Sequence, residues 1–175
     1  NEYFINSKLR GLQQDQARRK KVLEGQDPFA IVLSCADSRV VPELIFDTGI
    51  GELFVVRVAG NIANTSSMAS IEYAVAQLDA KVLIVLGHEN CGAINAALAG
   101  GHNGENIEHL LSHLEPAISQ SGTDAGADKI ARRNASLTRE VLLEKSTIIS
   151  EAVQAGKLEI IPAYYHLESG KVDFL

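Results

Sequence analysis

The sequence predicts an α/β fold with a mostly parallel central sheet flanked by helices and an antiparallel strand at the C-terminal edge. Short apolar runs bounded by glycine, proline or polar residues alternate with longer segments of helical periodicity. The last two apolar runs, 158–163 and 172–175, are joined by a turn at 168–170, which is typical of a hairpin. With 175 residues, 46% of them hydrophobic, residues 1–175 are expected to form one domain with a buried core.

The first half of the chain contains three predicted strands. Segment 9–23 is charged and only weakly amphipathic, which indicates a surface or subunit-spanning helix within an N-terminal arm at about 1–25. Apolar runs predict strands at 29–33, 53–58 and 82–86. Helices are expected after them, one beginning at Pro42 and the others at 67–78 and 93–99. Arg57 interrupts the second strand. The simpler interpretation is a cation at an edge or at the end of a strand, but an arginine inside an otherwise apolar strand needs a partner, so we expect it to be buried and paired.

The second half is predicted to be mainly helical. Residues 107–120 carry leucine and isoleucine at helical spacing, with Pro116 as an expected kink. His109 and His113 are spaced i, i+4 on this helix and could share a metal, although that spacing arises readily by chance on an exposed face. A longer helix is expected over 128–155.

Composition excludes several classes of protein. The formal net charge of −6 argues against a general nucleic-acid binder. No run approaches the roughly 18 apolar residues of a membrane span, and we expect no signal peptide. We therefore expect a cytoplasmic protein. The chain opens in what reads as the middle of an element, so a truncated N-terminus, and with it a periplasmic or secreted location, stays open.

The two cysteines and one histidine carry the chemistry. Cys35 follows the first predicted strand, whereas His88 and Cys91 follow the third. If these strands are parallel neighbours, the three side chains converge on one Zn2+ and leave a fourth position for water, as in catalytic zinc sites. A single disulfide is the simpler alternative, and a redox protein has little support without a C-x-x-C pair.

Asp37 and Arg39 sharpen this interpretation. An isolated Asp-x-Arg is usually a surface ion pair, but here it lies directly beyond a potential zinc thiolate. Arg39 can hold the carboxylate through a bidentate pair, which leaves the metal free for water. If Asp37 instead turned to the metal, the site would be closed.

Two motifs in this region resemble the signature of the β-class carbonic anhydrases. These are CADSR at 35–39 and GHENCG at 87–92. Segments GELFVVRVAGN (51–61) and SIEYA (70–74) are also similar to that family. The likeness is specific from about residue 31 to 99 and continues weakly to the end of the chain.

The resemblance implies a zinc-dependent lyase that hydrates CO2 reversibly to bicarbonate and a proton by attack of zinc-bound hydroxide. It implies one Zn2+ per chain held by Cys35, His88 and Cys91, with Asp37 and Arg39 as the catalytic dyad. It also implies a homodimer or homotetramer whose N-terminal helices wrap the partner subunit.

Substrate recognition should need little more than a small apolar pocket. We expect Val40, Ala59, Gly60 and Gly92 to line it. Two other activities stay open: a hydrolase of the same scaffold acting on COS or CS2, and a catalytically silent zinc-binding subunit. The intact dyad argues against the silent subunit, because a purely structural zinc would need neither residue.

Overall fold

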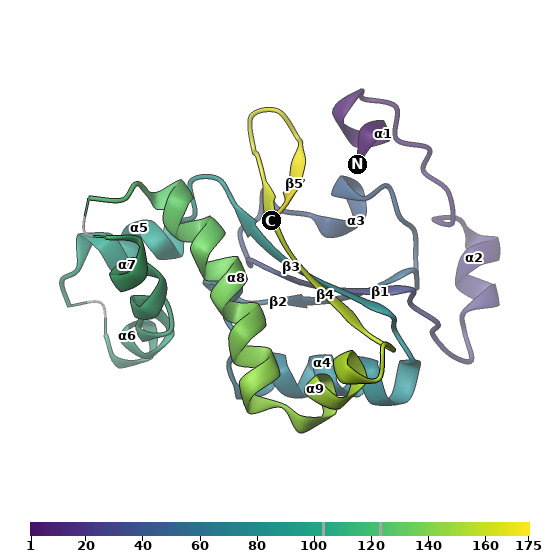
Figure 1. The fold of residues 1–175 in the computed structure, drawn as a ribbon. Coiled ribbons are helices and arrows are strands. Elements are labelled where there is room, and N and C mark those ends of the chain that lie inside the picture. Colours follow the sequence, from purple (N-terminus) through teal and green to yellow (C-terminus); the bar gives the residue numbers. More distant parts are fainter. Residues whose placement is uncertain (103, 123) are drawn as a thin grey trace.

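The computed structural model describes residues 1–102, 104–122 and 124–175, and it has an α/β architecture (Figure 1). One sheet within this part of the chain has the order β2-β1-β3-β4-β5. Its strands are β1 (Ala30–Ser34), β2 (Leu53–Arg57), β3 (Val82–His88), β4 (Glu159–Tyr165) and β5 (Val172–Phe174). The first four run parallel and β5 is antiparallel to β4, which confirms the predicted fold class.

Helices cover both faces of the sheet, which is why the central strands are apolar on both sides. On one face, Ile31 and Leu33 of β1 pack against α4, α8 and α9, and on the other Val32 packs in the cluster that includes α3 (Figure 1). The helices are α3 (Pro42–Ile45), α4 (Thr65–Leu78), α5 (Gly92–Ala99), α6 (Glu105–Ser112), α7 (Glu115–Ser121), α8 (Ala127–Lys145) and α9 (Thr147–Gln154). None of the helices in the described part of the chain combines the length and apolar character needed to cross a membrane.

Two predicted helices are each divided in two. The segment expected as one helix over 128–155 forms α8 and α9, because Ser146 has an extended backbone (φ −119°, ψ 110°) and its side chain caps α9 by accepting the N–H of Ile149. The segment 107–120 forms α6 and α7, with Pro116 in the first turn of α7, where its missing N–H costs no helical hydrogen bond.

The N-terminal arm is less helical than predicted. Within the expected helix 9–23 only α2 (Gln16–Lys21) is helical, and α1 (Glu2–Ile5) lies before it. The arm lies against the turn that precedes β2, where Arg10 pairs with Asp47 at 2.6 Å and the Gln13 carbonyl accepts the Ile50 N–H at 2.9 Å. Gly49 permits this contact, since a Cβ there would lie 2.5 Å from the Gln13 carbonyl oxygen.

Candidate metal centre

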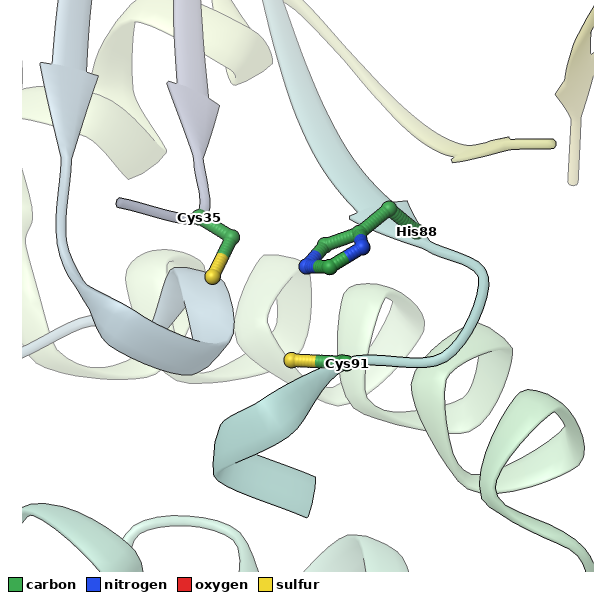
Figure 2. Close-up of side chains that lie close together, drawn as sticks. All are labelled: Cys35, His88 and Cys91. Carbon is green, nitrogen blue, oxygen red and sulfur yellow. The ribbon is translucent and has the colours of Figure 1, made fainter. Parts of the chain in front are cut away.

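The sheet brings the three predicted ligands together. β1 and β3 are parallel neighbours, with Ser34 opposite Leu86, so both strands end at the same edge. Cys35 directly follows β1, His88 is the last residue of β3, and Cys91 immediately precedes α5. Their ligand atoms all lie within 4.8 Å of one another, and all three residues are buried (Figure 2).

The His88 ring presents an unpartnered nitrogen to the two sulfurs. Its Nδ1 lies 2.8 Å from the Glu89 carbonyl, so Nδ1 carries the proton and donates it to that oxygen. This tautomer leaves a lone pair on Nε2, which is buried and has no hydrogen-bond partner among the described residues. Figure 2 shows a ring nitrogen directed toward the space between the sulfurs. A buried acceptor of this kind is costly unless it binds something, and imidazole nitrogen is a common zinc ligand.

The two cysteines are free thiols, so the disulfide alternative is wrong. The thiol of Cys91 donates to Cys35, and together with the His88 ring and the N–H groups of Asp37 (3.4 Å) and Gly60 (3.3 Å) it holds the pKa of Cys35 well below its usual range. The same contact with Cys35, helped by burial, raises the pKa of Cys91. Without a cation, therefore, only one of the pair ionises readily. Two sulfurs and one imidazole match the donor set that zinc prefers, and the charge of Zn2+ would allow both thiolates.

Asp37 and Arg39 form the predicted bidentate pair beside this cluster. Arg39 Nε lies 2.9 Å from Asp37 Oδ1 and Nη2 lies 2.7 Å from Oδ2, while the Arg39 backbone N–H also donates to Oδ1. Hydrogen bonding from Arg39 holds the pKa of the Asp37 carboxyl below its usual range. Nη2 of Arg39 also donates to the carbonyl of Asn90 at 3.2 Å, which ties the pair to the loop that carries Cys91.

Arg57 contacts the same region, but the prediction that it is buried is wrong. It is exposed at the end of β2, the edge strand, where water solvates its charge. Its Nε donates to the Cys35 carbonyl at 3.2 Å and its Nη2 to the Asp37 carbonyl at 2.6 Å. The arginine therefore holds the main chain on both sides of residue 36.

The four residues expected to line a substrate pocket lie in two environments. Ala59 and Gly60 belong to the short 3-10 helix η1 (Ala59–Asn61), and Gly92 begins α5 directly after Cys91. Val40 is fully buried in the hydrophobic cluster on the α3 face of the sheet, which includes neither cysteine. Their role as a pocket stays a prediction.

The histidine pair on α6, His109 and His113, does not form a metal cluster with other ligand side chains of the described residues. His109 and His113 lie edge to face with ring centroids 5.2 Å apart, and Nδ1 of His113 donates to the His109 carbonyl. Within residues 1–102, 104–122 and 124–175, the group of Cys35, His88 and Cys91 is the only one with three or more closely placed metal-ligand side chains.

Two contacts at the centre were missed from the sequence. Asn134 of α8 donates to the Gly60 carbonyl at 2.8 Å, and Asp128 of α8 accepts the N–H of Asn90 at 3.2 Å. The sequence does contain a signal for Asn134, because this polar residue falls at helical spacing between Ile130 and Leu137; in the structure it is buried beside Ile130.

Comparisons with known proteins agree with this geometry. A family model described as carbonic anhydrase matches residues 30–172. Carbonic anhydrase 2 of Mycobacterium tuberculosis is 36% identical over 177 residues, which cover 98% of this chain and 86% of the relative. The carbonic anhydrase of Helicobacter pylori strain J99 is 45% identical over 168 residues, covering 84% of this chain and 76% of the relative. A structure from work on two tetrameric β-carbonic anhydrases of Sordaria macrospora has a TM-score of 0.81 and 28% identity, covering 89% of this chain and 84% of that chain.

Proposed function

The chain belongs to the β class of the carbonic anhydrases, which hydrate CO2 reversibly to bicarbonate and a proton, and we propose that Cys35, His88 and Cys91 hold its single zinc while Asp37 and Arg39 assist catalysis. The observation that carries this assignment is the convergence of two sulfurs and an unpartnered imidazole nitrogen beside a bidentate carboxylate–guanidinium pair. Zinc, when bound, lowers the pKa of a coordinated water from about 15.7 to roughly 7 and so supplies the nucleophile for CO2.

The protein's own groups prepare the ligands for the metal. The Glu89 carbonyl fixes the His88 tautomer, so that the lone pair lies on Nε2. The N–H groups of Asp37 and Gly60 both donate to Cys35 Sγ and favour its thiolate. The burial of all three ligands keeps bulk water from competing with these contacts.

Asp37 is the candidate that orients the attacking water. Its carboxyl is ionised, and Oδ1 accepts two hydrogen bonds from Arg39 whereas Oδ2 accepts one. Oδ2 therefore has capacity to accept a further hydrogen bond, through which it would align the water's lone pair with the carbon of CO2. Arg39 keeps the carboxylate turned away from the ligand cluster, so the fourth metal position stays available.

We assign Ala59, Gly60 and Gly92 to the apolar surroundings of the substrate. These small residues lie in the segments next to Cys35 and Cys91, so a linear molecule such as CO2 bound against them would lie close to the metal ligands. COS and CS2 are linear electrophiles of similar shape, so the same site could act on them.

The second part of the proposal is a homodimer, or a homotetramer built from it. β2 is the edge strand of the sheet, and its residues Leu53–Val56 are only half-buried. Beside it, Phe54 lies against the ring of Tyr73 in α4 at a tilt of 38°, and Tyr73 is 50% exposed. An apolar edge strand is prone to pair with another chain, so we propose that a second copy covers this edge. The Sordaria macrospora relatives are described as tetrameric.

The test combines zinc analysis, CO2 hydration and sedimentation on the purified protein. We expect about one zinc per chain, rapid CO2 hydration in a stopped-flow assay, and a dimer or larger species. Cys35→Ser and Cys91→Ser should lose metal, whereas Ser112→Ala, on exposed α6, should retain it. A zinc-loaded protein that hydrolyses COS or CS2 but does not hydrate CO2 would contradict the assigned substrate, and an active monomer would contradict the dimer.

A further inference from the structure

Helix α8 contacts the segments that carry His88 and Cys91, and it contacts the segment that donates a hydrogen bond to Cys35. Asp128, Ala131 and Asn134 follow one another at intervals of three residues and so lie on one side of the helix. Asp128 contacts the loop before Cys91, Ala131 lies against the strand just before His88, and Asn134 contacts the loop that donates to Cys35. None of the three supplies a ligand atom to the group that the described residues form.

On the Cys35 side, the contact runs through Gly60. The Asn134 side chain is 2% exposed and its Nδ2 donates to the Gly60 carbonyl at 2.8 Å. Gly60 has φ +71°, and its own N–H donates to Cys35 Sγ at 3.3 Å. A Cβ at this position would lie 3.2 Å from Leu114, so the backbone here is confined from two sides. Asn134 thus fixes the residue that donates to the first thiolate.

On the Cys91 side, the contact runs through Asn90. Oδ1 of Asp128 accepts the Asn90 N–H at 3.2 Å, and Asn90 has the uncommon left-handed conformation (φ +49°). The Asn90 carbonyl accepts from Arg39, so the same residue links Asp128 to the catalytic pair.

Between these two contacts the helix backbone lies directly on β3. A Cβ at Gly87 would lie 2.9 Å from the Ala131 carbonyl oxygen, which leaves no space between helix and strand. Gly87 precedes His88, so the distance between α8 and this ligand is set by the packing of main chain on main chain. The orientation of the helix is therefore coupled to all three ligands.

We propose that α8 positions the metal ligands, with Asn134 and Asp128 as positioning residues for Cys35 and for Cys91. This inference rests on the zinc centre of the proposed function. A buried asparagine in an apolar stripe costs free energy unless it is hydrogen-bonded, and packing alone would be served by leucine. Loss of a group that orients metal ligands typically costs about 10- to 100-fold in metal affinity or activity, and we expect this range for zinc affinity in Asn134→Leu and Asp128→Ala.

The experiment measures zinc affinity by competition with a chromophoric chelator, together with the absorption spectrum of the cobalt(II)-substituted protein. Asn134→Leu keeps the number and branching of the side-chain heavy atoms but removes the donor, and Asp128→Ala changes an exposed residue. Thr138→Val is the matched control, because Thr138 is also a buried polar residue and lies one turn further along α8. It should change stability without changing zinc affinity or the cobalt spectrum.

We expect weaker zinc binding and an altered cobalt spectrum in both test variants. Wild-type affinity in Asp128→Ala, or in folded Asn134→Leu, would overturn the role of α8, as would an equal loss in Thr138→Val. If Asn134→Leu does not fold, Asp128→Ala alone decides. A wild-type protein that binds no zinc would instead overturn the metal centre itself, so the two failures are distinguishable.

Discussion

Adding one methyl group at Gly87 should loosen the packing of α8 on the sheet. The Cβ of Gly87→Ala would meet the Ala131 carbonyl oxygen at 2.9 Å, closer than van der Waals contact allows, and helix and strand would have to separate by a few tenths of an ångström. Overpacking of this kind costs about 1–3 kcal/mol. Replacing glycine also restricts the unfolded chain, which returns about 0.4–1 kcal/mol. The net loss in the free energy of unfolding should be about 1–2 kcal/mol.

For a chain of this length that loss corresponds to a decrease in Tm of about 2–8 °C. The assay is chemical and thermal unfolding of the zinc-free protein, so that metal affinity does not enter the result. Gly92→Ala is the control, because it also adjoins a ligand but its added Cβ would meet no atom within 4 Å. The control should be neutral or slightly stabilising, since alanine favours a helix. An unfolding midpoint for Gly87→Ala at or above the wild-type value would refute the argument.

Two further predictions concern the site. Arg39→Ala should retain zinc but lose about 10- to 100-fold in the rate of CO2 hydration, because Asp37 loses its bidentate partner and can occupy the fourth metal position. Metal analysis and stopped-flow kinetics check this prediction. A wild-type rate would contradict it. In the zinc-free protein, the free energy of unfolding should be greatest at about pH 8.5, the ordinary cysteine pKa. The lowered pKa of Cys35 makes stability rise with pH below that value, since the unfolded chain then binds more protons. The raised pKa of Cys91 makes stability fall above it, since the folded protein then retains a proton that the unfolded chain has lost. Measuring the free energy of unfolding from pH 6 to 10 tests this. The same stability maximum in the Cys91→Ser variant would contradict it.

The ligand set and the sheet could be predicted from the sequence because both follow from local pattern. Apolar runs indicated the strands, and a parallel arrangement puts the residues after β1 and β3 at one edge. Cysteine and histidine are uncommon enough in this chain that their placement at two strand ends pointed to a metal. The sequence did not reveal the breaks in the helices. The interruption at Ser146 depends partly on a hydrogen bond to Glu72, 74 residues earlier in the chain, which periodicity within the helix cannot register.

Arg57 illustrates a different limit. An apolar run around an arginine predicts burial only for an inner strand, and the sequence does not indicate which strand lies at the edge of the sheet. Because β2 is that strand, the guanidinium reaches both water and the main chain of the neighbouring loop, and no carboxylate partner is needed.

The hydrogen bonds that position the ligands and the dyad could not be predicted from the sequence, and the reason is chemical. Many of the groups that hold the ligands and the dyad belong to the main chain: the carbonyl of Glu89 for His88, the N–H of Gly60 for Cys35, and the carbonyl of Asn90 for Arg39. Every residue carries a carbonyl, and every residue except proline an N–H, so residue type cannot mark these positions. Such a main-chain contact can be recognised in the sequence only when a side chain makes it. Here that side chain is Asn134, a polar residue within the apolar stripe of α8. A polar residue at a core position of a predicted helix is therefore a sign that a distant main-chain group needs to be held, and in this chain that group adjoins the metal ligand Cys35.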